Sequence, residues 1–142
     1  MNNLKRDSIF FKDLNFIIKN CNNFQLYLSL CNDNSYIQQC HNKILNEYSK
    51  TVKWLSIPAD NRFLLSFVEN NIDSSKVTIL SGLKDNKNIN QLLAVMNMAR
   101  SSFYKLNLPI ILWVNSDLIF KFISIAPDFY NCTSSIHLEK LS

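Results

Sequence analysis

Hydrophobic residues occur along this chain as short continuous runs that alternate with longer amphipathic segments. Four runs have the length and composition of buried strands, and they cover residues 24–31, 52–57, 76–80 and 109–114. No hairpin dipeptide such as Asn-Gly joins them, and strands that alternate with helices are typical of a parallel sheet. A last short run, 134–140, predicts an edge strand in which His137 and Glu139 face water.

The segments between these runs have helical spacing of their apolar residues. They predict five helices, over about 11–21, 37–48, 62–72, 92–106 and 118–125, of which the fourth is the longest. Asp33 is expected to cap the second helix. Asp60 or Asn61 is expected to cap the third, and Ser116 or Asp117 the last, which Pro127 ends.

These elements predict a single α/β domain over residues 1–142, with residues 1–23 as a helical lead-in. The expected fold is a three-layer sandwich, with a mainly parallel sheet of four or five strands and helices on both faces. A chain of 142 residues is long enough to bury one core. Residues 110–114 lack polar alternation, which favours a central strand buried on both sides.

Composition and charge exclude several classes of protein. The formal charge of +4 is spread without a basic run, which argues against nucleic acid as a partner. Charges interrupt the first residues where a signal peptide needs an apolar core, and no run reaches the roughly 18 apolar residues of a membrane span. Four cysteines without regular spacing suggest reduced thiols. We therefore expect a cytoplasmic protein with no membrane contact.

Ligands of open α/β sheets bind at the carboxyl ends of the strands, so those loops are where a site is expected. The chain has one glycine, Gly82. A Walker A loop needs two glycines before its lysine, and the dinucleotide fingerprint needs three. The first strand leads instead into Cys31-Asn32-Asp33-Asn34-Ser35, where the carboxylate of Asp33 would repel a phosphate. The residues predict no phosphate loop.

Other reactive side chains do not form a recognisable catalytic or metal motif. His41 directly follows Cys40, so on a helix their side chains point about 100 degrees apart. Zinc would need ligands from at least three separate segments, and Asp85 lies in a loop beyond the third strand. We expect no catalytic residue, no metal and no cofactor, and hence no enzyme activity.

Four segments in order, 24–45, 78–83, 90–115 and 124–139, resemble one known family. It is an N-terminal module of bacterial multidomain proteins that usually precedes tetratricopeptide repeats and is related to the STAND class of P-loop NTPases. The matching motifs are Cys31-Asn32, Asn97 with Arg100, Pro109 with Trp113, and Ala126-Pro127-Asp128-Phe129. Ser101 stands where the family has glutamate, and residues 130–134 lack the tryptophans and arginine of the family turn.

The resemblance implies an ASCE-like parallel sheet that has lost its phosphate loop. It thus implies a pseudo-NTPase that acts as a non-catalytic interaction or assembly module in bacterial signalling or phage defence and docks onto a second protein or onto itself. Together, the strand ends and the family motifs indicate five ligand-binding or interaction residues, Asn32, Asn34, Arg100, Asn115 and Asp128.

Two alternatives remain open at this stage. The first is a nucleotide-binding domain without hydrolysis, in which Asn32, Asn115 and Ser116 contact the nucleotide. The second is weak nucleic-acid binding through scattered lysines and arginines. The Ala-Pro-Asp-Phe turn likewise has a purely structural interpretation, as a helix stop whose Phe129 packs into the core.

Overall fold

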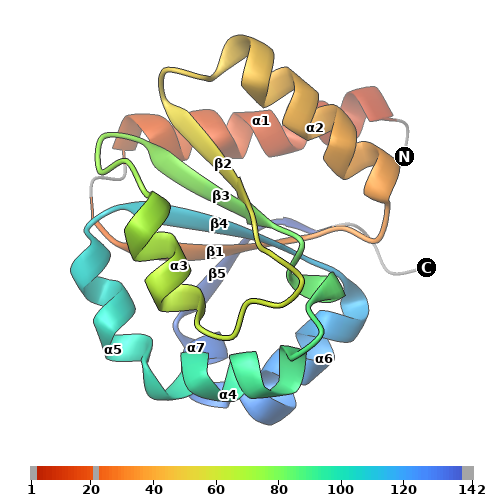
Figure 1. Ribbon diagram of the computed structural model, residues 1–142. Coiled ribbons are helices and arrows are strands. Elements are labelled where there is room, and N and C mark those ends of the chain that lie inside the picture. The colour runs from red at the N-terminus through yellow and green to blue at the C-terminus, as the bar shows by residue number, and fades with distance from the viewer. Residues whose placement is uncertain (1–2, 21–22, 139–142) are drawn as a thin grey trace.

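The computed structural model describes residues 3–20 and 23–138, and it contains one five-stranded parallel sheet in the order β2-β3-β4-β1-β5 (Figure 1). The strands are β1 (Gln25–Leu30), β2 (Val52–Ser56), β3 (Val77–Ser81), β4 (Pro109–Val114) and β5 (Thr133–Leu138). The predicted α/β class with a parallel sheet is confirmed. In Rossmann and flavodoxin-like sheets the first strand lies beside the second, whereas here β2 is at the far edge and β1 pairs with β4 and β5.

Helices cover both faces of the sheet, which confirms the three-layer arrangement (Figure 1). One face carries α1 (Asn3–Asn20) and α2 (Asn34–Glu47). The other carries α3 (Leu64–Asn71), α4 (Ile89–Met98), α5 (Arg100–Phe103), α6 (Ser116–Ile125) and α7 (Pro127–Asn131). No described helix has the length and apolarity needed to cross a bilayer.

The central strand β4 is buried along its whole length, as its unbroken apolar run predicts. Its side chains alternate between two cores: Ile110 and Leu112 join the core under α3–α7, and Ile111 and Trp113 join the core under α1 and α2. The ring of Trp113 stacks on Phe10 of α1 at 4.9 Å between centroids. A strand with two apolar faces is therefore what lets a 142-residue chain form both cores.

The helix predicted over 92–106 is interrupted. Helix α4 ends at Met98, Ala99 has φ −95° and ψ 10°, and α5 covers Arg100–Phe103 before a 3₁₀ turn. The break keeps the spacing of apolar residues almost unchanged, so periodicity alone could not reveal it. The longest helix is instead α1, with 18 residues, which begins well before the predicted residue 11.

Two predicted helix caps are wrong. Helix α6 is capped by Asn115, whose Oδ1 accepts the Leu118 N–H at 2.9 Å, so Ser116 is already helical. Helix α3 begins after Phe63 and has no side-chain cap. The expected caps Asp60 and Asn61 lie in the preceding loop, where the Asn61 N–H is bound to Pro58 O at 3.1 Å.

Two other predictions concern the ends of elements. The cap by Asp33 is confirmed, since Asp33 is the N-cap residue of α2. The last strand, β5, does lie at an edge of the sheet. The prediction that His137 and Glu139 face water falls outside the side chains and residues that the structure describes.

Candidate functional site at the carboxyl ends of the strands

The crevice between β1 and β4 is the topological switch point of the sheet. These strands are neighbours, yet the chain leaves β1 for α2 on one face and leaves β4 for α6 on the other (Figure 1). Loops that diverge in this way leave a crevice at the carboxyl ends, where open α/β sheets bind their ligands. The site is therefore built around the residues that follow β1 and β4.

Asn32 and Ser116 join the two diverging loops. The Asn32 Oδ1 accepts the Ser116 N–H at 2.9 Å, and its Nδ2 donates to the Ser116 Oγ at 2.8 Å. A third short contact, 3.1 Å, lies between the Ser116 hydroxyl and Asn32 Oδ1. The contacts cross 84 positions of sequence, so Asn32 holds the switch point together through hydrogen bonds within the chain.

The N-terminus of α2 points toward this crevice, but its first amides are occupied. Asp33 Oδ1 accepts the N–H groups of Ser35 at 3.0 Å and Tyr36 at 3.3 Å. The Asp33 carbonyl accepts the Ile37 N–H at 3.2 Å. A helix N-terminus attracts anions through these amides and the helix dipole. Here the Asp33 carboxylate occupies the position that such an anion would take. It would have to move away before a phosphate could bind there.

A hollow of about 220 Å³ opens beside the crevice on the α2 side of the sheet. It is lined from the ends of β1, β3 and β4 and from the first turns of α2. Its polar lining consists of Asn34, Gln38, Ser81, Lys84, Asp85 and Asn115, and its apolar lining includes Cys31, Ile37, Trp113 and Val114. The hollow thus contains two of the predicted site residues, Asn34 and Asn115.

Lys84 lies at this hollow and reaches from the loop after β3 to α2. Its ammonium group donates to Asn34 Oδ1, across 50 positions of sequence. No carboxylate of the described residues forms an ion pair with it. Lys84 is therefore a half-buried cation whose observed partner is a neutral amide.

Gly82 brings Lys84 into this place. Its backbone is left-handed, with φ of 90°, and an added Cβ would lie 3.1 Å from the Ile57 carbonyl oxygen. Residues other than glycine are disfavoured in that conformation. The only glycine of the chain thus turns the backbone at the end of β3, close to the loop after β2.

Asn86 fixes the loop after β2 to the loop after β3. This side chain is 5% exposed. Its Nδ2 donates to the carbonyls of Pro58 at 3.2 Å and Asn61 at 2.9 Å, and its Oδ1 accepts the Asn88 N–H at 2.8 Å. Three satisfied hydrogen bonds at a buried amide make this a rigid connection.

A second, wider hollow of about 470 Å³ lies on the α6 side and shares Lys84 and Asn115 with the first. Its lining also includes Asp117, Phe120 and Lys121. The two hollows flank the ends of β3 and β4, so Asn115 separates them while it caps α6. Like the first hollow, the wider one is lined by charges of both signs.

Arg100 of α5 and Asp128 of α7 form a separate group. Arg100 Nη1 lies 3.9 Å from Asp128 Oδ2, with both side chains close to half exposed, and it donates to the Asn97 carbonyl at 3.1 Å. Asn97 Oδ1 accepts the Phe129 N–H at 2.9 Å. Phe129 is buried against Phe103 and Phe122. The structural interpretation of the Ala-Pro-Asp-Phe turn, with Phe129 in the core, is therefore confirmed.

Tyr104 and Cys132 lie near this group. A hydrogen bond with the Cys132 side chain raises the pKa of the Tyr104 hydroxyl, and burial and the charge of Cys132 act in the same direction against the weaker effect of Arg100. The shift favours the protonated form of the Tyr104 hydroxyl.

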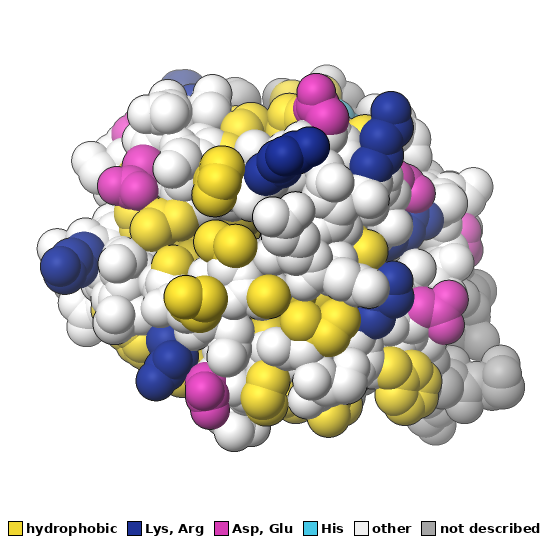
Figure 2. Space-filling view, turned by 60° about the horizontal axis from the view of Figure 1, so that its bottom comes forward, with side chains coloured by type: hydrophobic (Ala, Val, Ile, Leu, Met, Phe, Trp, Pro, Cys, Tyr) yellow, Lys and Arg dark blue, Asp and Glu magenta, His cyan; other side chains and the backbone are white. Residues whose placement is uncertain are grey.

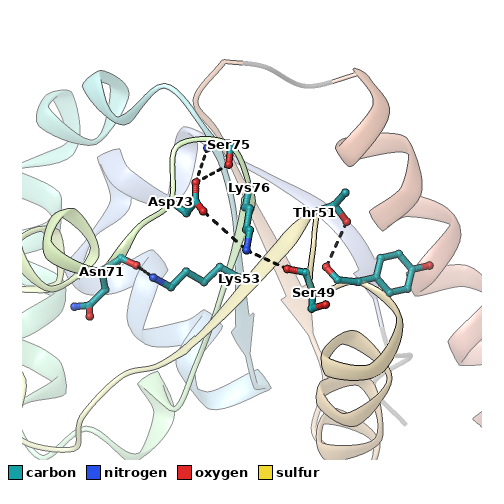
Figure 3. A network of polar contacts seen from close by, with 8 residues as sticks. Ser49, Thr51, Lys53, Asn71, Asp73, Ser75 and Lys76 are labelled. Atoms are coloured by element: carbon teal, nitrogen blue, oxygen red, sulfur yellow. Dashed lines mark hydrogen bonds and ion pairs between the residues drawn. The ribbon is translucent and has the colours of Figure 1, made fainter.

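The amino ends of the strands carry a different polar network (Figure 3). Lys76 Nζ lies 3.9 Å from Asp73 Oδ2 and donates to Ser49 O at 3.0 Å. The Ser75 hydroxyl and amide donate to Asp73 Oδ1 at 2.6 and 3.0 Å, and they lower the pKa of the Asp73 carboxyl. Lys53 also donates to the Asn71 carbonyl. The network ties the loops before β2 and β3 together.

The remaining residues that were considered for catalysis, Cys40 and His41, are held in place by packing contacts. Cys40 is buried in the core, and the half-buried ring of His41 stacks on Trp54 at 4.5 Å between centroids. No group of three His, Cys, Asp or Glu side chains among the described residues could hold a metal ion. These contacts explain the placement of both side chains through packing.

No protein-family model matches this chain, and no curated protein does. The site is therefore interpreted from its own residues. Asn32, Asn34 and Asn115 come together at the switch point, while Arg100 and Asp128 meet elsewhere. Sequence reasoning indicated the loop after β3 but did not single out Lys84. The available signal was a lysine two positions after the only glycine at a strand end.

Proposed function

We propose that this chain is a non-catalytic, pseudo-NTPase-like interaction or assembly module of a bacterial signalling or defence system. The sheet is parallel throughout, in the order β5-β1-β4-β3-β2 when read from the other edge, which agrees with the ASCE-like parallel sheet that the resemblance implies. The Asp33 carboxylate at the N-terminus of α2 supports the loss of phosphate chemistry.

The observation that carries the interaction function is the exposed apolar surface of the α3–α7 layer. Met98 at the end of α4 is 82% exposed, Phe120 of α6 is 67% exposed, and Phe63 before α3 is 58% exposed. Figure 2 looks toward this layer and shows hydrophobic side chains spread over it between scattered charges. Large exposed apolar side chains of this kind occur in protein-binding surfaces.

Partner capture with matched surface variants tests this function. The tagged chain is cross-linked in cells of its source, and bound proteins are quantified for the wild type and two double variants. Met98→Glu with Phe120→Glu should lose the partner. Phe16→Glu with Leu45→Glu, on the opposite layer and 62% and 56% exposed, should keep it. Equal retention by both double variants would exclude this surface as the interface.

Calorimetric titration with magnesium ATP and GTP tests the nucleotide alternative, which stays a prediction. Because Asp33 already occupies the first amides of α2, we expect no saturable heat of binding. We also expect that neither nucleotide is hydrolysed to release phosphate. Release of phosphate above background, abolished by substitution of a residue at the switch point, would overturn the non-catalytic proposal.

A further inference from the structure

We infer that the hollow on the α2 side of the switch point binds a small organic anion, a carboxylate or a phosphate, through Lys84. This inference goes beyond the interaction function and is independent of the α3–α7 surface. It rests on the charge, the hydrogen-bond donors and the size of the hollow.

Lys84 has a different kind of partner from Lys43 and Lys76. Lys43 and Lys76 each have a carboxylate oxygen at 3.9 Å, from Glu47 and Asp73. Lys84 has the neutral amide of Asn34. The bond from the Lys84 ammonium to Asn34 has one charged partner, whereas an anion would add the Coulomb attraction between two unit charges. An anion in the hollow therefore offers Lys84 a better partner than Asn34 does.

Donors next to Lys84 are also available for an acceptor. Asn115 uses its Oδ1 to accept the Leu118 N–H, which leaves its amide nitrogen for the hollow. The Ser81 Oγ accepts the Trp54 indole N–H at 2.9 Å, so its own hydrogen can be donated elsewhere. Asp85, an exposed member of the lining, is the opposing charge. The lining thus places one cation and two neutral donors around a common space.

The size of the hollow selects a small ligand. Its volume of about 220 Å³ is below the roughly 300–1,000 Å³ that is typical of sites for drug-sized molecules. Its apolar part, with Ile37, Trp113 and Val114, suits a short carbon skeleton. Asp33 already accepts hydrogen bonds from the first amides of α2, so these amides are not available to a chain of phosphates.

The single glycine gives an unambiguous probe for this site. Protein labelled with ¹⁵N-glycine has one backbone amide signal, that of Gly82, which lies in the lining. Titration with inorganic phosphate, and separately with succinate, is followed at constant ionic strength to keep screening fixed. We expect the Gly82 signal to shift and saturate with at least one of them. The titration that saturates shows whether the site binds phosphate or a carboxylate.

Variants of neighbouring charges decide whether Lys84 binds the anion. Lys84→Gln should weaken binding about tenfold, because it removes the positive charge that attracts the anion, and Lys84→Arg should retain most of it. Lys87→Gln is the matched control, because Lys87 is exposed and outside the lining. Asp85→Asn should tighten binding by removing a repulsive charge. Indole signals of the two tryptophans report that each variant is folded.

Three results would overturn the inference. They are a Gly82 shift that stays linear with both anions, an equal loss of binding in Lys84→Gln and Lys87→Gln, and unchanged affinity in Lys84→Gln. None of them bears on the partner experiment, because that experiment uses a different surface.

Discussion

A hollow lined by a lysine lies at each end of the sheet, but the lysine has a charged partner at one end and a neutral partner at the other. At the amino ends the hollow measures about 300 Å³, and its Lys76 is neutralised by Asp73 and bound to a backbone carbonyl. At the carboxyl ends the hollow on the α2 side measures about 220 Å³, and its Lys84 contacts a neutral amide. Of these two hollows the one at the amino ends is the less promising site, because the charge of its Lys76 is already compensated.

The loops at these two ends are also held by different groups. Charged side chains and serines connect them at the amino ends (Figure 3). Asparagine amides connect them at the carboxyl ends, through Asn32, Asn34 and Asn86. An amide holds a loop by hydrogen bonds without adding charge, so the carboxyl end stays rigid and leaves Lys84 uncompensated. Four predictions test this contrast, from the largest expected effect to the smallest.

Removal of the buried amide at the carboxyl end should cost the most stability. Asn86→Ala leaves two carbonyls and one N–H without their partner in a site that is 5% exposed. We expect the free energy of unfolding to fall by about 3 kcal/mol. Ser75→Ala at the amino end should lower it by about 1 kcal/mol or less. Urea denaturation measures both, and similar losses would contradict the contrast.

Replacement of the glycine that positions Lys84 should have the next largest effect. Gly82→Ala puts a Cβ at φ of 90° and 3.1 Å from Ile57 O, so we expect a loss of about 2 kcal/mol. Asn107 at the amino end has φ of 58°. Asn107→Gly should change stability by no more than about 0.5 kcal/mol, because asparagine tolerates this region. Thermal denaturation of both variants compares them, and a neutral Gly82→Ala would show that the loop can rearrange.

Removal of the α2 cap should have a smaller effect on stability and should also change ligand binding. Asp33→Ala loses the hydrogen bonds to the Ser35 and Tyr36 amides, for an expected cost of about 1 kcal/mol. It should also tighten phosphate binding, because a negative charge leaves the switch point. Asp33→Asn keeps a capping oxygen and should be nearly as stable as the wild type. Weaker phosphate binding in Asp33→Ala would mean that Asp33 does not repel the anion.

The smallest effect is the pH dependence at the amino end. Hydrogen bonds from Ser75 hold the pKa of Asp73 below its ordinary value. The resulting stabilisation is present above the pKa of the unfolded chain and is lost as pH falls through the lower folded value. Carboxyl carbon NMR measures that pKa, and Ser75→Ala should raise it toward the ordinary value. An unchanged pKa in this variant would assign the effect to the Ser75 amide, Lys76 and Lys53 instead.

Local features of this chain were predictable from its sequence. The four apolar runs became strands, the last run became an edge strand, and Asp33 caps α2 as expected. Each depends on neighbours within a few positions, where periodicity and capping rules apply. The break between α4 and α5 was missed because it leaves the spacing of the apolar residues almost unchanged.

The sequence by itself therefore determined the α/β class, the succession of strands and helices, and the absence of a glycine-rich phosphate loop. Only the tertiary structure decided which strand ends meet. It placed β1 beside β4, Asn32 against Ser116, and Lys84 against Asn34. These contacts join residues 84 and 50 positions apart. Contacts between residues so far apart in sequence depend on how the whole chain buries its two cores. A local sequence pattern therefore cannot predict them.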